Sequence, residues 1–224
     1  MDIHLLKEFL ERHRDKTTII EHEVKAFLRG SGLSVPRGLY VSRIDGIPLE
    51  IPLTYPLVAK VSSSRITSKT EVKGVRLGIM DENGLREAIK ELFEIRDAEG
   101  VLIEEMAPQG VEVIIGGVID KEFGPIVMFG LGGILVELYK DVAFALAPLK
   151  RKDALWLINQ VKGYKILSGY RGMPPVDIDP LVDLVITTSE IIATGMVKEI
   201  DLNPVALYPD HYMILDAKMK IDVQ

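Results

Sequence analysis

The chain has 224 residues, 47% of them hydrophobic, which is enough to bury one large core or two smaller ones. Its net charge is −6 and its pI is about 5.3, so it lacks the basic surface that neutralises the phosphates of a nucleic acid, and such a partner is excluded. Cysteine is absent, which excludes disulfides and thiol catalysis.

The composition also indicates a compartment. The N-terminal stretch "MDIHLLKEFLERHRDK" is charged and amphipathic and lacks the apolar centre of a signal peptide. No apolar run approaches the roughly 20 residues that span a bilayer. We therefore expect a soluble, cytoplasmic protein without a membrane partner. Asn and Gln occur three times each while 27% of residues are charged, a usage that favours a thermophile.

The first half of the chain predicts mixed helices and strands. We expect helices over residues 5–13, 21–32 and 82–100, and strands over residues 38–42, 57–62, 71–79 and 100–106. The long helix places Leu85, Ile89, Leu92 and Phe93 on one side. Three prolines between residues 43 and 56 argue against a regular helix there.

The second half predicts more strands. We expect strands over residues 111–120, 124–130, 142–149, 199–208 and 211–219, and helices over residues 151–161 and 180–195. The expected fold class is α+β, with an N-terminal lobe of residues 1–100 and a C-terminal lobe of residues 101–224. Two lobes joined by a strand near residue 103 would leave a cleft between them for a small ligand.

The stretch "EIDLNPV" carries the first candidate site. In a strand, Glu199, Asp201 and Asn203 share one face, while Ile200 and Leu202 face a core. Oxygen-bearing side chains along one face are suited to a hard cation. An ordinary solvated strand face explains the same alternation, so the pattern alone leaves both readings open.

The hairpin that follows strengthens the metal reading. If "YPDH" forms the loop, Leu207 faces Tyr212, and counting back places Asn203 opposite Asp216. Two carboxylates and an amide would then share a face, where Mg²⁺ is the natural counter-ion because it takes few protein oxygens. A slip of one residue in the register would undo this arrangement.

The second candidate site follows the strand of residues 57–62. Lys60 ends an apolar stretch and needs a charge partner, because a lone buried ammonium is costly. A hydroxyl-rich loop follows, with Lys69 and Lys73 among its cations, which can cradle a polyphosphate. A polar surface hairpin has the same composition and stays the alternative.

These segments resemble the ATP-grasp fold, two α/β lobes with the nucleotide cleft between them. More closely they look like the β subunit of ADP-forming acyl-CoA (acetyl-CoA) synthetases, in the succinyl-CoA synthetase-like superfamily. The resemblance runs from about residue 20 to residue 222. It is carried by "YPLVAKV", "IEEM", "VEVIIGG", "FGPIVMFGLGGILVELYKDVAFALAPL", "LSGYRG", "EIDLNPV" and "LDAK".

The resemblance implies roles by position. It implies that Lys60 contacts nucleotide phosphates, that the backbone of residues 104–107 pairs with adenine, and that Glu112 holds the ribose. Lys73, a phosphate-binding candidate from the loop itself, replaces a glycine of the relatives. It implies magnesium ligation by Asn203 and Asp216, with Asp201 beside them. The remaining implied roles are catalytic, near the transferred phosphate, at Ser68, Lys69, Glu137 and Arg171. For the adenine segment the named residues are Glu104, Met106 and Ala107.

The implied activity is that of an acid–thiol ligase: acyl-CoA + ADP + phosphate ⇌ acid + CoA + ATP. The implied cofactors are ATP or ADP and Mg²⁺. The implied partner is a CoA-binding α subunit, in a hetero-oligomer, that carries a phosphohistidine. The ATP-grasp lobes would move that phosphoryl group to or from the nucleotide by positioning it and cancelling its charge.

The chain departs from the family at its relay histidine. Relatives read "HKSD-GGV" where this chain reads "SKTEVKGV", so Ser68 stands at the histidine position. A serine does not form the labile phosphoramidate of a reversible carrier. Either the partner delivers phosphate directly, or the step is impaired, or the chemistry has changed. A regulatory nucleotide-binding subunit and a stand-alone ATP-grasp ligase are therefore the alternative functions.

Overall fold

The computed structural model describes residues 2–48, 50–133, 140–172 and 174–222. The chain divides into two compact units, a smaller one of Pro36–Pro108 and a larger one that combines Met1–Val35 with Gln109–Gln224. This division differs from the predicted lobes 1–100 and 101–224. The strand after residue 100 stays with the smaller unit, and the first 35 residues belong to the larger one.

The N-terminal segment joins the larger unit through backbone pairing and apolar packing. The two-residue strand β1 (Thr18–Ile19) pairs antiparallel with β11 (Ala217–Lys220), at the far end of the sequence. The helices α1 (Ile3–Glu11) and α2 (Glu21–Gly30) bury their apolar sides in the core of the larger unit. A strand this short carries no periodic signal, so the sequence did not reveal it.

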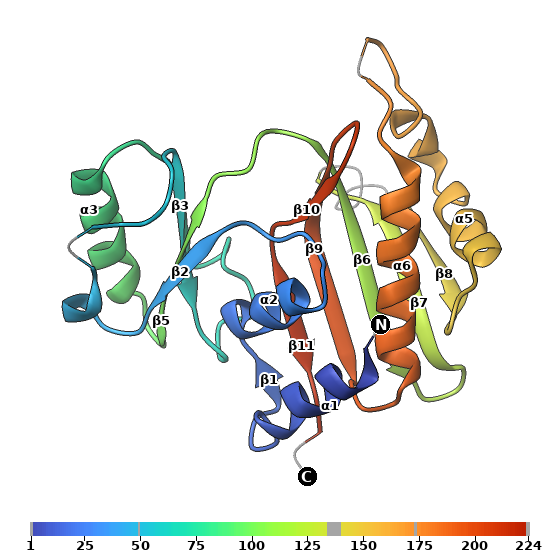
Figure 1. Cartoon of the computed structure of the whole chain (residues 1–224), viewed down its shortest axis with the longest axis horizontal. Coiled ribbons are helices and arrows are strands. Elements are labelled where there is room, and N and C mark those ends of the chain that lie inside the picture. The colour runs from blue at the N-terminus through green and yellow to red at the C-terminus, as the bar shows by residue number, and fades with distance from the viewer. Residues whose placement is uncertain (1, 49, 134–139, 173, 223–224) are drawn as a thin grey trace. The chain divides into compact units, whose positions relative to one another are not determined.

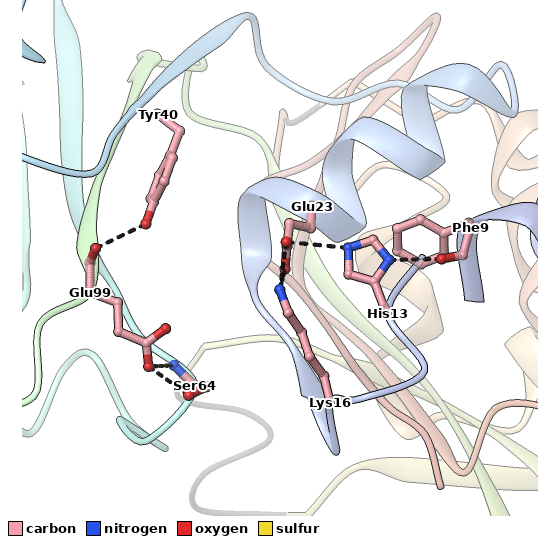
Figure 2. Close-up of polar contacts among 7 residues, drawn as sticks. All are labelled: Phe9, His13, Lys16, Glu23, Tyr40, Ser64 and Glu99. Atoms are coloured by element: carbon pink, nitrogen blue, oxygen red, sulfur yellow. Dashed lines mark hydrogen bonds and ion pairs between the residues drawn. The ribbon is translucent and has the colours of Figure 1, made fainter. Parts of the chain in front are cut away.

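A polar cluster fixes the turn between α1 and α2 (Figure 2). The imidazole of His13 lies 2.7 Å from the carbonyl oxygen of Phe9 through Nδ1 and 3.2 Å from the Glu23 carboxylate through Nε2. Lys16 donates to the same carboxylate at 2.7 Å. Burial raises the pKa of Glu23, but the hydrogen bond and charge of Lys16, together with the charges of His13 and His22, outweigh it and lower the pKa.

The larger sheet has the strand order β1-β11-β9-β6-β7-β8, with β10 beside β9. The pairings β9–β11, β9–β10, β6–β9, β6–β7 and β7–β8 are antiparallel. Its other strands are β6 (Val111–Asp120), β7 (Gly124–Leu131), β8 (Val142–Leu146), β9 (Glu199–Leu207) and β10 (Tyr212–Ile214). The accompanying helices are α5 (Arg151–Asn159), the short 3-10 helix η2 (Lys162–Ile166) and α6 (Ile178–Ala193).

One face of this sheet is covered by α5 and α6 (Figure 1). Val113, Ile115, Phe129 and Leu202 point to that side and are fully buried. Because strand side chains alternate, Asp201 and Asn203 point to the opposite face, which α5 and α6 leave open. Among the described residues, no helix is long and apolar enough to cross a membrane.

The smaller unit is a four-stranded antiparallel sheet in the order β2-β5-β3-β4. Its elements are β2 (Gly38–Val41), the 3-10 turn η1 (Ile44–Gly46), β3 (Leu57–Ser62), β4 (Val75–Ile79), α3 (Glu82–Phe93) and β5 (Gly100–Glu105). In α3, Leu85, Ile89 and Leu92 of the predicted apolar side are buried against the sheet, and Phe93 is partly buried. The only helix among the described residues from 43 to 56 is the turn η1.

The structure divides the predicted last strand, residues 211–219, into β10 and β11. The cause lies opposite, at Pro204. Its carbonyl oxygen accepts the N–H groups of both Leu215 and Asp216, at 2.9 and 3.4 Å. Two amides on one acceptor interrupt the ladder, and proline has no N–H with which to restore it. The register is nonetheless the same on both sides of the break.

Neighbouring glycines on β6 provide a matched test of this layering. A Cβ on Gly117 would lie 3.0 Å from Cγ2 of Ile200 and 3.2 Å from Cβ of Ile192 on α6. On Gly116, which faces the other way, the nearest atom would be the flexible end of Met128 at 3.4 Å. We expect Gly117→Ala to destabilise the fold by about 1–3 kcal/mol through overpacking.

Gly116→Ala is the control and is expected to cost less than half as much in the same denaturant titration. Equal losses for the two variants would contradict the assignment of the helix-covered face.

Candidate functional site

The predicted register of the C-terminal hairpin is confirmed. Leu207 lies opposite Tyr212, and beyond the break Leu202 lies opposite Ala217. Between these pairs the N–H of Asn203 donates to the carbonyl oxygen of Asp216 at 3.2 Å. Opposed residues of an antiparallel pair project to the same face, so Asn203 and Asp216 share the open face of the sheet.

Negative charge is concentrated on this face. The pKa of Asp201 is raised to about 6, first by burial and then by the negative charges of Asp216 and Glu199, while Lys218 and Lys220 lower it only in part. The two lysines lie opposite Asp201 and Glu199, and Lys220 pairs with Glu199 at 2.7 Å. The same register count that placed Asp216 would have found both lysines in the sequence.

Glu112 projects from the same face of the sheet as the aspartates. Along β6 it alternates with Ile114 and Gly116, and Gly116 lies opposite Asp201. Its side chain is exposed, while its carbonyl oxygen accepts the N–H of Gly132 at 2.7 Å. One sheet face therefore presents Glu112 together with the predicted metal ligands.

The donor set fits a magnesium ion. Among the described residues, no group of three or more His, Cys, Asp or Glu side chains is arranged to hold a metal. Mg²⁺ is usually held by one or two carboxylates, with water and phosphate oxygens completing its shell. Two aspartates and an amide match that requirement, and the charges of Asp216 and Glu199, which add to the effect of burial on the pKa of Asp201, are ones that a cation would offset.

Lys60 has the charge partner that its burial requires. Its Nζ lies 2.7 Å from Oε2 of Glu104, and both residues are buried. The register of β3 and β5 places Lys60 opposite Leu102 and Val58 opposite Glu104, so the two charges meet diagonally on one face. The sequence predicted a partner for Lys60, but it assigned Glu104 only through its backbone.

Most backbone groups of the segment predicted to bind adenine already form hydrogen bonds within the protein. Glu104 pairs with both β2 and β3. The N–H of Glu105 donates to the carbonyl oxygen of Arg37 at 3.0 Å, and the N–H of Met106 donates to the carbonyl oxygen of Pro56 at 2.9 Å. An adenine contact would thus use the remaining backbone groups, such as those of Ala107.

The loop of residues 63–74 joins β3 to β4 and carries side chains that the sequence predicts to bind phosphate. Ser68 is partly buried, and its hydroxyl oxygen accepts the N–H of Glu71 at 3.3 Å. The carbonyl oxygen of Lys69 accepts the N–H of Gly74 at 2.6 Å. Lys73 is exposed and has a φ of 51°, a left-handed conformation that turns the chain into β4.

Of the other two predicted catalytic residues, Glu137 lies outside the described residues. Arg171 is exposed with a φ of 51°, and its guanidinium lies 5.5 Å above the ring of Tyr170. Among the described residues, no contact joins Arg171 to the aspartates.

A separate surface hollow of ≈ 830 Å³ lies beside α1, next to Met196 and Ile221. It contains none of the predicted site residues. Its lining carries three cations, Lys7, Arg12 and Arg14, and three carboxylates, Glu8, Glu11 and Asp222, and Arg14 pairs with Glu11 at 2.8 Å. This hollow therefore offers less for a charged ligand than the carboxylate face does.

Comparison with known proteins identifies the class. Residues 11–221 match the sequence profile of the ATP-grasp domain, and the chain belongs to that family. The predicted fold class is thereby confirmed, and ATP-grasp domains bind nucleotide.

The particular relatives are β subunits of ADP-forming ligases. The chain is 37% identical over 224 residues to the β subunit of acetate–CoA ligase (ADP-forming) I of Pyrococcus furiosus, covering 95% of this chain and 96% of that protein. It is also 37% identical to the isoenzyme II β subunit of that organism, covering 96% and 95%. The predicted resemblance and the ligase class are confirmed.

Solved structures agree. An acetyl-coenzyme A synthetase 1 chain of Ca. Korarchaeum cryptofilum, in complex with coenzyme A and Ca-AMPCP, matches with a TM-score of 0.88, 37% identity and 98% coverage of both chains. Another structure of that enzyme contains Mg-AMPPCP, with a phosphohistidine segment pointing towards the nucleotide-binding site. It matches with a TM-score of 0.80 and 38% identity, covering 97% of this chain and 98% of that one.

The raised pKa of Asp201 predicts a pH-dependent stability. A carboxyl whose pKa rises from 3.8 unfolded to about 6 folded lowers stability as pH rises through that window, because the folded state then gives up a proton that it holds tightly. In EDTA, the free energy of unfolding of Asp201→Asn should therefore increase relative to that of the wild type between pH 4 and 7, by on the order of 2–3 kcal/mol.

Asp120→Asn is the control in the same chemical denaturation series. Backbone N–H bonds from Phe123 and Glu122 lower the pKa of Asp120, so this variant should lose stability relative to the wild type at neutral pH. A pH-independent difference between Asp201→Asn and the wild type would show that the charge crowding is absent.

Proposed function

We propose that this chain is the nucleotide-binding β subunit of an ADP-forming acyl-CoA synthetase. It transfers a phosphoryl group between ADP and a phosphohistidine carried by a CoA-binding α subunit, in the reaction acyl-CoA + ADP + phosphate ⇌ acid + CoA + ATP. The observation that carries the proposal is the open sheet face, where Asp201, Asn203 and Asp216 crowd negative charge opposite a helix-covered core.

The proposal assigns roles to residues of each unit in turn. The larger unit provides Asn203 and Asp216 as magnesium ligands, with Asp201 beside them and Glu112 for the ribose. When bound, Mg²⁺ neutralises and aligns the phosphate oxygens. Burial raises the pKa of Asp201 most, the charges of Asp216 and Glu199 raise it further, and a bound cation would offset those two charges.

The smaller unit provides the cations. Lys60 is held by Glu104 at 2.7 Å, so its ammonium group is oriented before any ligand arrives. Lys69 and Lys73 on the loop of residues 63–74 contact the phosphates, and the backbone around Ala107 receives adenine. Arg171 and Glu137 act on the transferred phosphate in this proposal.

Ser68 determines how the phosphoryl group travels. Its hydroxyl oxygen caps the N–H of Glu71, which gives the side chain a structural use in the loop. We infer that the partner's phosphohistidine donates directly to the β-phosphate of ADP, without a relay on this chain. In that step the N–P bond breaks, the new O–P bond forms, and the histidine recovers its electron pair.

The same observation favours a second candidate, a nucleotide-binding regulatory subunit that has lost the relay histidine. Mixing the chain with its α partner, acetyl-CoA, ADP, Mg²⁺ and phosphate separates the two functions. We expect ATP to form at a rate that depends on both subunits. A mixture that binds Mg-ADP but makes no ATP would establish the regulatory role, and ATP formed without a partner would indicate a stand-alone ligase.

Substitution of Asp216 tests the metal site. We expect Asp216→Ala to weaken Mg-ADP binding by at least about tenfold, corresponding to about 1.4 kcal/mol, because it removes a metal ligand. The melting temperature without nucleotide should be unchanged or higher, since the substitution also relieves repulsion of Asp201. Calorimetric titration and thermal denaturation measure the two quantities.

Asp210→Ala is the matched control, because Asp210 lies in the loop of the same hairpin and is exposed. It should bind Mg-ADP as the wild type does. If Asp216→Ala unfolds the protein while the surviving folded fraction keeps its affinity, Asp216 is structural and the proposed site is wrong.

A further inference from the structure

Glu99, which the sequence did not single out, holds the start of the loop of residues 63–74 (Figure 2). Its Oε1 accepts the backbone N–H of Ser64 at 2.9 Å and the Ser64 hydroxyl at 2.6 Å. The hydroxyl of Ser63 lies 3.4 Å from the same oxygen, and Ser63 Oγ in turn accepts the N–H of Arg65 at 3.0 Å. The first turn of the loop is thus built around one carboxylate oxygen.

Glu99 is itself fixed by its backbone. Its N–H donates to Ser62 at 2.9 Å, and its carbonyl oxygen accepts the hydroxyl of Tyr40 at 3.0 Å, as Figure 2 shows for Tyr40. The next residue, Gly100, lies against Tyr40, where a Cβ would come within 2.4 Å of the phenolic oxygen. Because Tyr40 needs this glycine to reach its acceptor, the carboxylate of Glu99 projects from a rigid point at the start of β5.

The far end of the same loop is also held. Arg76 on β4 donates from Nη1 to the carbonyl oxygen of Lys73 at 2.5 Å and from Nε to the carboxylate of Glu91 at 2.8 Å. The N–H of Val61 closes the base by donating to the carbonyl oxygen of Gly74 at 2.8 Å. Residues 65–72, which include Ser68 and Lys69, therefore lie between two anchored ends of the loop.

Glu99 carries a negative charge although it anchors a loop that is proposed to bind anions. Burial raises the pKa of Glu99, but hydrogen bonds from Ser64 and Ser63 and the charge of Arg65 outweigh it and lower the pKa. The group is therefore a carboxylate at neutral pH, at the base of a loop proposed to bind phosphates. Through its charge alone, Glu99 would repel a nucleotide.

We propose that Glu99 is a positioning residue for nucleotide binding: it fixes the first turn of the loop of residues 63–74, so that the cations of that loop meet the phosphates. The inference rests on the proposed function. It predicts that removing a negative charge weakens the binding of an anion, which is the reverse of what charge alone dictates.

The test compares Glu99→Ala, Glu99→Gln and Ser64→Ala in the full chain, with Glu94→Ala as the control. Glu94 is an exposed carboxylate on the segment that leads to Glu99. We expect Glu99→Ala to raise the Kd for Mg-ADP about tenfold, the effect of losing one charge-assisted hydrogen bond. Glu99→Gln keeps an acceptor oxygen and should recover part of that affinity, and Glu94→Ala should match the wild type.

A second readout needs no nucleotide. Trypsin cleavage after Arg65 and Lys69, followed by mass spectrometry, reports how well the loop is held. We expect faster cleavage for Glu99→Ala and, to a smaller extent, for Ser64→Ala at an unchanged melting temperature. The double variant should be cleaved no faster than Glu99→Ala, because Ser64→Ala removes only a contact that Glu99→Ala already removes.

The two readouts separate this inference from the proposed function. Unchanged cleavage together with equal or tighter Mg-ADP binding in Glu99→Ala would overturn the positioning role. If the wild type itself fails to bind Mg-ADP, the proposed function falls and the nucleotide part of this inference falls with it. Faster cleavage in Glu99→Ala would then establish Glu99 as an anchor of the loop only.

Discussion

Electrostatic crowding on one sheet face is the constraint on which the site depends. Asp201 is held there by strand pairing, and Asp216 by its backbone hydrogen bonds to Asn203 and Pro204. The apolar side of β9 is fixed in the core by Ile200 and Leu202. The strand cannot turn its carboxylates away without exposing those apolar side chains to water, which costs about 1.5–3 kcal/mol for each one. Repulsion between the carboxylates is therefore maintained by the hydrophobic effect, and a bound cation is the means of relieving it.

The smaller unit has the opposite feature, a buried positive charge that is compensated within its own sheet. Lys60 is a cation in a buried strand, and Glu104 compensates it at 2.7 Å within the same sheet. A buried pair gives little net stability because desolvation offsets the attraction, whereas losing one partner costs about 3–5 kcal/mol. Such a pair is weak evidence for stability and better evidence for an oriented charge. In the proposed function, its value is that the ammonium group is fixed in direction before a phosphate arrives.

The sequence predicted those features that short-range geometry determines. The turn "YPDH" and the alternation along residues 199–203 were enough to place Asn203 opposite Asp216, because a hairpin register follows from its loop. It could not supply the pairing of Thr18 with Lys220, which joins the two ends of the chain, or name Glu104 as the partner of Lys60 across 44 positions. Both depend on which strands become neighbours, and no local pattern encodes that.

The sequence did not reveal the role of Glu99 for a related reason. Its contacts also show how a carboxylate in the smaller unit has its charge compensated. A glutamate in "RDAEG" looks like an ordinary surface residue, and only the fold brings it to Ser64, 35 positions away. Carboxylates near a polyphosphate are tolerable when something else takes up their charge. Glu104 is neutralised by Lys60 and Glu99 by the donors of the loop that it anchors, whereas Asp201 and Asp216 share a face on which lysines compensate only in part. The magnesium ion is therefore expected where the protein leaves negative charge uncompensated, and the carboxylates of the smaller unit serve to orient cations and loop instead.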